Sequence, residues 1–368
     1  SYVVPEAHFE NLTIQQLSKD LFDDYVRSPE TSQAVERIKN HLKQHLHQFV
    51  RRFDLDMLIV ENAMAIPMNV TLGLALTEMI AETCIPTIGH HHDFAWERPR
   101  FAVRAADDYL RAAFPATLNS ITHAVVNSFG QRQLALRTGA ASLVVPNVMD
   151  FDSPPPEADG YADDLRTVLG VGPDDFFLLQ PTRVVARKRI ERAIELAKRL
   201  ELPCRLVISH ATGDEGSDYA AFLREYIKLL DVNVRFAADS FSAERGLTPD
   251  GRKIYSLADA YCPADLVTYP STIEGFGNAF LEAIYYRKPI VMSTYEIYRV
   301  DIQPKGFKVI EFGDYITEDT VRETRDLLSN PDQMAEMVEL NYEIARRHYS
   351  YANLEKLLVA LISLGLGI

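Results

Sequence analysis

The sequence is poor in cysteine and has no long run of apolar residues. It holds three cysteines in 368 residues, Cys84, Cys204 and Cys262, and no two of them form a CxxC pair. So sparse a set argues against a disulfide framework or a cysteine-based zinc site and indicates a reducing compartment. No apolar run reaches the roughly 18 residues that a membrane-spanning helix needs. We therefore expect a cytoplasmic protein without a membrane span.

Basic residues are also in the minority. The chain has 38 lysines and arginines against 52 aspartates and glutamates, a net charge of −14. Because a nucleic-acid-binding protein normally presents a basic face, this balance disfavours nucleic acid as a partner. A local basic pocket for phosphate stays compatible with it. The start shows no signal-peptide pattern and no Met, so we expect residues upstream. The sequence indicates no oligomeric state.

What the sequence does have is two series of short apolar runs, separated by segments of helical length. The first series comprises the runs at 55–62, 85–92, 122–128 and 141–151, and the second those at 175–183, 204–210, 232–238, 264–271 and 289–293. Alternating strands and helices predict parallel sheets with helical crossovers. The predicted fold class is α/β, with two doubly wound Rossmann-like domains facing across a cleft.

A proline-rich acidic stretch, DSPPPEADGYADD, interrupts this alternation and predicts the interdomain linker. We expect an N-terminal domain over 1–152 and a C-terminal domain over 153–345. The segment 346–368 is predicted as a C-terminal helix, and 250–264 as a further helix. Ligands of such sheets bind beyond the carboxyl ends of the strands, so we look for chemistry there, in the cleft.

A glycine loop follows the run at 264–271. In TIEGFGN, Gly275 and Gly277 let backbone N–H groups approach a ligand closely. The next helix begins near Asn278, and its first N–H groups suit a phosphate. Glu274 in the loop and Glu282 in the helix would accept hydrogen bonds from sugar hydroxyls. This layout fits a nucleotide-sugar, although an ordinary turn followed by a surface acid is the simpler alternative.

A basic segment follows the run at 175–183. In PTRVVARKRI, Arg183 closes the predicted strand and Lys188 begins the next helix. Two fixed cations at the carboxyl edge of a sheet can neutralise a diphosphate leaving group. For Arg187 and Arg189 we expect a solvated basic turn instead.

The Arg and Lys five residues apart after a strand, with the E-x7-E motif around Gly-Phe-Gly, resemble the retaining glycosyltransferases of family 4, which have the GT-B fold. The resemblance covers about 178–293. It implies that Arg183 and Lys188 hold the donor's diphosphate and that Glu282 holds the ribose. Glu274 would contact the donor sugar.

The resemblance extends to the glycine loop and to the reaction. The backbone of Gly275, Phe276 and Gly277, and the helix start at Asn278, would lie against the donor. The implied reaction is retaining transfer of a hexose, glucose or mannose, from a UDP- or GDP-linked donor to an acceptor hydroxyl, without a further cofactor. A nucleotide-sugar-binding protein and a nonhydrolysing epimerase of the same fold are the alternatives.

In the first domain, IPTIGHHHDFAWERPRF resembles the family's strand that ends in a histidine facing the donor sugar. The His-x-Asp spacing favours His91, next to Asp93, as a catalytic residue, with His92 as the alternative. The family's glycine-rich loop after the first strand is not found, and we expect it to be missing from the chain. The stretches GFGNAFLEAIYYRKPIV and HHHDFAWERPRF are similar to those of mannosylglucosylglycerate-type synthases.

We expect no metal site. Adjacent residues on a strand point to opposite sides, so three consecutive histidines cannot all reach one ion. The pair Asp54 and Asp56 precedes a predicted buried strand and is interpreted as a strand-entry turn.

Three further side chains of the first domain are candidates for the acceptor site. Arg98 and Arg100 follow the histidines closely, and arginine forks favour carboxylate or phosphate. With His92 they predict an anionic acceptor; an exposed basic turn is the alternative.

Overall fold

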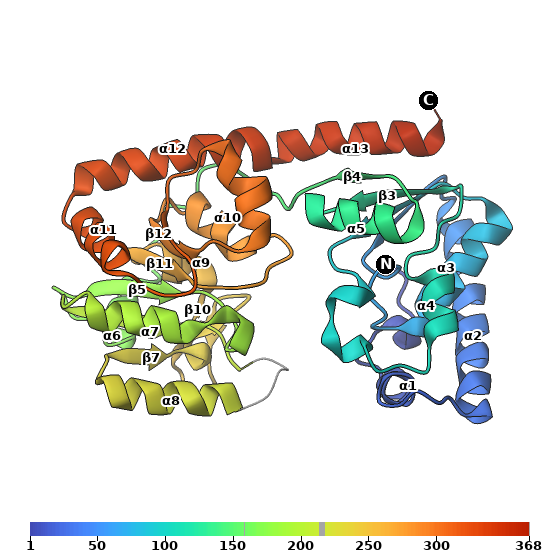
Figure 1. Ribbon diagram of the computed structural model, residues 1–368, viewed down its shortest axis with the longest axis horizontal. Helices are drawn as coiled ribbons and strands as arrows, with labels where there is room; N and C mark the ends of the chain where they lie inside the picture. The colour runs from blue at the N-terminus through green and yellow to red at the C-terminus, as the bar shows by residue number, and fades with distance from the viewer. Residues whose placement is uncertain (158, 213–217, 368) are drawn as a thin grey trace. The chain divides into compact units, whose positions relative to one another are not determined.

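The computed structural model describes residues 1–157, 159–212 and 218–367 and divides into two compact units (Figure 1). Unit 1 is Ser1–Pro146 with Glu355–Ile368, and unit 2 is Asn147–Leu354. The domain boundaries that the sequence suggested, after 152 and after 345, stay predictions. The predicted linker contains Ala158 and the predicted C-terminal segment ends at Ile368, and both residues lie outside the described ones.

Unit 1 contains, in its described residues, a four-stranded parallel sheet with the order β1-β2-β3-β4. The strands are β1 (Leu58–Glu61), β2 (Thr87–His91), β3 (Ile121–Val125) and β4 (Ser142–Val144). The register pairs Glu61 with His90 and His90 with Ala124. The carboxyl ends of β1 and β2 therefore lie side by side.

Helices cover the sheet of unit 1, and several of them begin after a capping side chain. They are α1 (Leu12–Phe22), α2 (Pro29–Phe53), α3 (Val70–Thr83), α4 (Asp107–Ala113), α5 (Ser128–Thr138) and the short turns η1 (Pro5–Ala7), η2 (Ala95–Glu97) and η3 (Pro99–Phe101). The Ser28 hydroxyl caps α2, and Asn69 and Asn127 cap α3 and α5. Apolar residues of α3 pack on Leu58 and Val60, whereas Leu134 of α5 packs on Val125.

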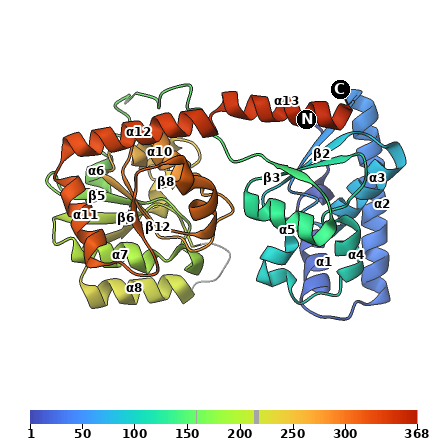
Figure 2. The ribbon, with the colours of Figure 1, turned by 45° about the horizontal axis from the view of Figure 1, so that its top comes forward.

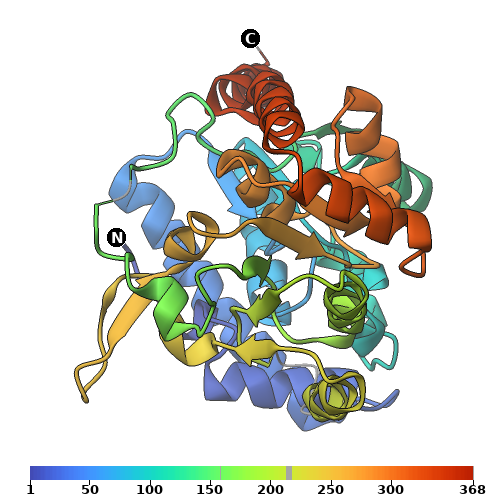
Figure 3. The same ribbon diagram turned by 90° about the vertical axis from the view of Figure 1, so that its left-hand side faces the viewer.

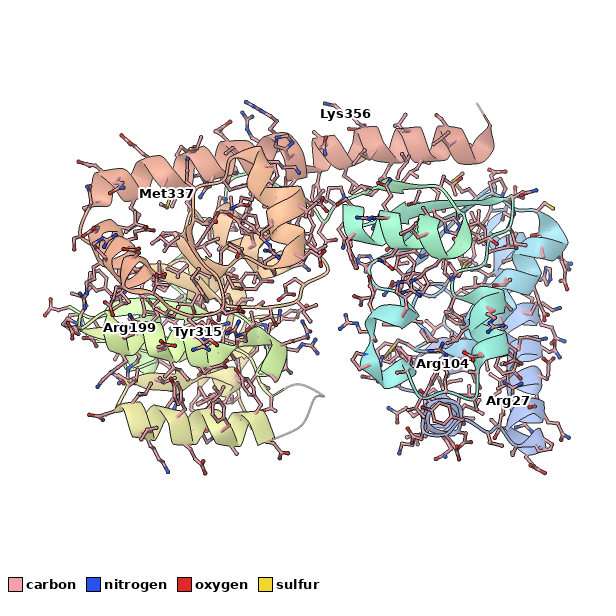
Figure 4. All side chains as sticks on the ribbon, viewed as in Figure 1. Arg27, Arg104, Arg199, Tyr315, Met337 and Lys356 are labelled. Carbon is pink, nitrogen blue, oxygen red and sulfur yellow. The ribbon has the colours of Figure 1, made fainter. Side chains whose placement is uncertain are left out.

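Arginines fix the start of α4 in unit 1. Arg27 binds the carboxylate of Asp108 at 2.7 Å and the carbonyl of Ala105 at 2.8 Å. Arg104 binds Asp107 at 2.6 Å, and Figure 4 labels both arginines in unit 1. The acids lie in the first turn, where the helix dipole also favours negative charge.

Unit 2 contains, among the described residues, a six-stranded parallel sheet with the order β13-β12-β11-β5-β6-β7. Its strands are β5 (Phe176–Gln180), β6 (Cys204–Ile208), β7 (Val234–Phe236), β11 (Leu266–Tyr269), β12 (Ile290–Ser293) and β13 (Ile310–Phe312). In the strands β5, β11 and β12 nearly all side chains are buried, as in parallel sheets covered on both faces. The predicted α/β class with parallel sheets is confirmed.

The helices and turns of unit 2 are α6 (Leu165–Val168), η4 (Ala186–Lys188), α7 (Ile190–Arg199), α8 (Asp218–Leu230), η5 (Ala238–Ser240), α9 (Leu257–Tyr261), α10 (Asn278–Tyr285), η6 (Tyr298–Ile302), η7 (Gln303–Lys305), α11 (Glu318–Leu328) and α12 (Pro331–Tyr349). The last helix, α12, packs against α10 and α11 (Figure 2). Ser350 separates it from α13 (Tyr351–Leu366), most of which belongs to unit 1.

In the part of the chain that the structure describes, no helix is both long and apolar enough to cross a membrane.

The prediction of a single helix over 250–264 is wrong. Its first half is strand β10 (Lys253–Ser256), which pairs with the short strands β8 (Phe241–Ser242) and β9 (Gly246–Leu247). The β9–β10 hairpin projects from unit 2 (Figure 3). Only then does α9 begin, because the Ser256 hydroxyl accepts the N–H of Asp259 and caps it.

Candidate functional site

The candidate site lies at the carboxyl edge of the unit 2 sheet, where the strand order reverses. From β5 the chain proceeds to β6 and β7 on one side, whereas β11, β12 and β13 lie on the other. Loops that leave neighbouring strands in opposite directions open a crevice at this switch point, which is where doubly wound sheets bind ligands. Arg183 and Lys188 follow β5, and Glu274 follows β11, so the structure brings these predicted residues to one edge.

Backbone hydrogen bonds join the two loops. The N–H and hydroxyl of Thr272 both donate to the carbonyl of Arg187, at 3.0 and 3.1 Å. In return, the Arg187 guanidinium donates to the carbonyl of Ile273 at 3.4 Å. The loop carrying the cations and the loop carrying the acid are thereby held in a fixed relation.

An ion pair between Lys188 and Glu274 forms the centre of the site. The Lys188 ammonium donates to Oε1 of Glu274, and both side chains are only 10% exposed. Burial lowers the pKa of Lys188, Glu274 opposes this shift, and Arg187 and Arg183 lower the pKa further. Lys188 thus lies in a cluster of three cations with one nearby carboxylate, that of Glu274. A more highly charged anion, such as a diphosphate, can compete with Glu274 for the lysine.

Arg187 and Arg189 differ from the expectation of a solvated turn. Nη1 of Arg187 lies 3.7 Å from Oε2 of Glu274, and its side chain is 21% exposed. Arg189 is 16% exposed and binds Asp314 at 3.2 Å. The turn folds back onto neighbouring loops, which the local sequence does not reveal.

His210 is a basic neighbour that the sequence reasoning missed. It lies two residues after the end of β6, and the carbonyl of the next residue, Ala211, accepts the N–H of Val184 at 3.1 Å. Burial lowers the pKa of His210, and the charges of Arg183 and Lys188 lower it further, as expected for a ring near both cations. The sequence signal that could have revealed it is the position of His210 just after the predicted strand, at the end of VISH.

The glycine loop offers backbone to a ligand. Phe276 is 3% exposed, with its ring against Tyr349, and its carbonyl accepts the hydroxyl of Tyr295 at 2.7 Å. Gly277 has φ +116° and precedes α10 without a side chain to cap it, which leaves first-turn N–H groups of α10 for other acceptors. Gly275 lies between Glu274 and Phe276, and exposed Asn278 accepts the amide of Asn147 at 2.6 Å.

Glu282 lies on α10 and faces α9. Its Oε2 accepts the hydroxyl of Tyr261 at 2.8 Å, and the ring of Tyr261 stacks on that of Tyr286 at 5.0 Å. Burial raises the pKa of Glu282, and the Tyr261 hydrogen bond opposes the rise. The predicted ribose ligand is therefore a half-buried acid whose orientation is fixed by a tyrosine.

The histidines of β2 separate as strand geometry requires. His91 is 1% exposed and its Nε2 lies 2.9 Å from Nδ1 of His123, inside unit 1. His92 is 40% exposed and contacts Glu61 at 3.1 Å. His91 is therefore covered within unit 1 and His92 is the more accessible of the two, while the choice between them as the residue that faces a sugar stays a prediction.

The buried pair of His91 and His123 predicts a pH dependence. Burial lowers the pKa of His123 to about 4 and that of His91 well below its ordinary value. The histidines of the unfolded chain bind protons near pH 6.5, whereas His123 in the native state binds its proton only near pH 4. The free energy of unfolding therefore falls as the pH drops through this window. We expect His123 alone to account for about 3 kcal/mol.

Unfolding by urea between pH 4 and 7.5, followed by fluorescence of the single tryptophan, Trp96 in unit 1, measures this slope. His123→Asn should flatten the pH dependence, whereas His8→Asn, at an exposed position, should leave it unchanged. An equal slope in the His123 variant would contradict the assignment.

The two arginines proposed for an acceptor have different surroundings. Arg98 donates to both carboxylate oxygens of Asp93 at 2.7 Å, so Asp93 largely neutralises its charge. Arg100 is exposed, with its guanidinium over the ring of Phe101 and against the sulfur of Met68. Asp54 ends α2 in a left-handed conformation, φ 49°, in agreement with a strand-entry turn.

A separate cavity of about 520 Å³ lies elsewhere in unit 2. Its lining includes Arg166, Arg245, Asp259 and Tyr286. Arg245 forms ion pairs with both Asp159 and Asp259, and its Nε donates to Asp259 at 2.9 Å. The cavity contains none of the predicted donor residues, and its two arginines are paired with acids of the protein, so we place the chemistry at the switch point instead.

Comparison with known proteins extends this description. Residues 162–343 match the family described as glycosyl transferases group 1. The mannosylglucosylglycerate synthase of Petrotoga mobilis is 34% identical over 335 residues, which cover 85% of this chain and 73% of that protein. The synthase of the same name from Thermotoga maritima is 32% identical over 381 residues, which cover 96% of this chain and 87% of that protein.

Solved structures share the fold. HepE of Anabaena, in complex with UDP and glucose, has a TM-score of 0.62 at 16% identity, over 90% of this chain and 81% of its own. Sucrose-phosphate synthase of Thermosynechococcus elongatus has a TM-score of 0.62 at 14% identity, over 92% and 79%. At these identities the likeness concerns the fold alone, and the predicted GT-B fold is confirmed.

Proposed function

The chain belongs to the group 1 glycosyltransferases, and on that premise we propose that it transfers a hexose from a nucleotide diphosphate sugar to an acceptor hydroxyl with retention at the anomeric carbon. The observation that carries the proposal is the buried pair of Lys188 and Glu274 at the switch point of unit 2. It sets a cation for the diphosphate next to an acid for the sugar.

The charges of the site suit this reaction. When the bond between the anomeric carbon and the diphosphate oxygen breaks, its electron pair leaves with the diphosphate, and negative charge grows there. Lys188 and Arg183 stabilise that charge, with His210 beside them. A diphosphate that competes for Lys188 releases the Glu274 carboxylate for the sugar hydroxyls and for the developing positive charge of the ring. With these cations in place, the diphosphate needs neither a metal ion nor another cofactor.

The acceptor in this proposal carries a glycerate. The support is the 34% and 32% identity to two mannosylglucosylglycerate synthases over most of the chain. A product of that name forms when mannose is added to glucosylglycerate, whose carboxylate makes it anionic. His92 and the exposed Arg100 are the acceptor-domain side chains that we assign to substrate contacts.

The test is a transfer assay with four donors, GDP-mannose, UDP-mannose, GDP-glucose and UDP-glucose, each with glucosylglycerate. We expect nucleotide release to depend on the acceptor, and a product one hexose heavier by mass spectrometry. The anomeric coupling of the product by NMR checks retention. Binding of a nucleotide without transfer from any of the four donors would contradict the proposal.

The ribose contact has its own prediction. We expect Glu282→Gln to weaken nucleoside diphosphate binding at least about 10-fold, since a hydrogen bond to a charged acceptor contributes about 1.5–3 kcal/mol, or about 10- to 150-fold in affinity. Calorimetry with GDP and with its 2′,3′-dideoxy analogue isolates the effect: the wild type should prefer GDP, and the variant should lose that preference. Glu296→Gln, an exposed acid of the same unit, is the control. A variant that keeps the full preference would remove Glu282 from the ribose site.

A further inference from the structure

Three side chains converge at the carboxyl ends of β1 and β2 in unit 1. The register pairs Glu61 with His90 across the two strands. His92 stands two residues beyond His90, and alternate residues of an extended chain point to the same side. The intervening His91 points away, into the interior, where it meets His123. Two imidazoles and one carboxylate therefore share a small region of the sheet edge.

The ligand atoms of this group lie close together. Nδ1 of His90 is 2.9 Å and Nε2 of His92 is 3.1 Å from the same atom, Oε2 of Glu61. All three atoms fall within 4.8 Å of one another. Ligands about 2.0–2.1 Å from a tetrahedral zinc ion stand about 3.3 Å apart, so a small outward movement would accommodate the ion.

The surroundings of His90 suit a metal-binding imidazole. Its Nε2 faces the carbonyl of Val145 at 3.4 Å, and because a carbonyl only accepts, Nε2 carries the proton. In the neutral ring, the lone pair of Nδ1 then points at the Glu61 carboxylate, and two acceptors face each other. A second ring proton or a metal ion between them satisfies both lone pairs, and metal-binding histidines commonly donate their other N–H to a carbonyl in this way.

The backbone that carries the histidines is held in place. Asn62, in a left-handed conformation with φ 58°, donates its N–H to the carbonyl of His90 at 2.8 Å. Its side-chain oxygen accepts the N–H of His92 at 3.0 Å and that of Asp93 at 3.3 Å. The Asp93 carboxylate itself is engaged by Arg98. The two imidazoles are therefore set by the fold rather than by flexible loops.

We propose that Glu61, His90 and His92 bind one divalent transition metal ion of the Zn²⁺ class. Two imidazole nitrogens and one carboxylate oxygen suit such ions, and three protein ligands leave a fourth position for water or a substrate oxygen. The ion occupies Nε2 of His92, so in the metal-bound form only Nδ1 of this ring is left for another contact. The site goes beyond the proposed transfer reaction, whose diphosphate is bound in unit 2.

Direct metal binding tests the proposal without reference to activity. Metal-free protein is titrated with Zn²⁺ against a chromophoric chelator, and Co²⁺ absorption reports the coordination geometry. We expect one tight site per chain, and a loss of affinity of at least about 100-fold in both His90→Ala and Glu61→Gln, because loss of an outer-shell partner alone costs 10–100-fold. The Glu61 side chain is 60% exposed, so that variant should fold normally, as its thermal unfolding without metal will verify.

A second pair of histidines supplies the matched control. The rings of His41 and His45, one helical turn apart on α2, have centroids 4.6 Å apart and offer an alternative place for a zinc ion. His45→Ala should leave the tight site unchanged. The proposal is overturned if no stoichiometric binding occurs, if affinity falls in His45→Ala instead, or if His90→Ala and Glu61→Gln bind as the wild type does.

Discussion

Replacement of Lys188 by alanine is expected to lower turnover about 10²–10³-fold, the usual effect of removing one preorganised charge contact to a transition state. Lys188 is 8% exposed, and its ammonium feels the charges of Arg183 and Arg187. Release of nucleotide from the donor in the presence of acceptor measures the loss. Lys198→Ala, an exposed lysine of α7, should stay within about twofold of the wild type.

Stability has to be separated from catalysis at this position. Removal of Lys188 leaves the Glu274 carboxylate buried without its closest counter-ion, which typically costs about 3–5 kcal/mol. The double variant Lys188→Met/Glu274→Gln removes both charges, and a buried ion pair replaced as a whole is often neutral in stability. We expect this double variant to unfold like the wild type and still to be inactive. Turnover near the wild-type value in the double variant would contradict the role of the pair.

Gly277→Ala is expected to destabilise unit 2 by about 2–5 kcal/mol, for two independent reasons. The backbone has φ +116°, a conformation that residues with a Cβ adopt only with strain. An added Cβ would also lie 2.5 Å from the hydroxyl oxygen of buried Tyr295 and 3.2 Å from that of buried Tyr269. Equilibrium unfolding by denaturant, followed by circular dichroism, measures the loss.

Two further variants test the explanation. Gly313→Ala should be nearly neutral, because no described atom comes within 4 Å of a Cβ at that position. Adding Tyr295→Phe to Gly277→Ala removes the nearest oxygen, at the loss of its hydrogen bond to Phe276, so the two changes should cost less together than the sum of the separate losses. A Gly277→Ala protein whose unfolding free energy is within about 0.5 kcal/mol of the wild type would contradict the steric account.

The sequence predicted the strands and loops that matter in unit 2 because each is a local pattern. In LLQPTRVVARKRI and in TYPSTIEGFGNAF, a buried strand is followed directly by a short loop and the beginning of a helix. Parallel strands then place Lys188 and Glu274 at the same edge. The pairing of the two side chains, with Arg187 beside them, follows from the neighbouring positions of β5 and β11, which no local pattern reveals.

The histidine strand shows where local reasoning ends. A shift of one residue along a strand moves a side chain from one face of the sheet to the other. In this strand the covered histidine is His91. Alternation along one strand does not identify the partner across the sheet, and Glu61 lies 29 residues before His90 in the chain. The same limit applies to 250–264, where pairing with β9 overrides an apparently helical pattern.

The central claim is that the donor's diphosphate binds at the carboxyl edge of the unit 2 sheet, on Lys188 and Arg183. A crystal structure of the chain with GDP-mannose or UDP-glucose tests it most directly. We predict phosphate oxygens within hydrogen-bonding distance of Lys188 Nζ, the Glu274 carboxylate on hexose hydroxyls and Glu282 on the ribose. A nucleotide lodged elsewhere, such as in the cavity beside Arg166 and Arg245, with the pair of Lys188 and Glu274 undisturbed, would contradict the account.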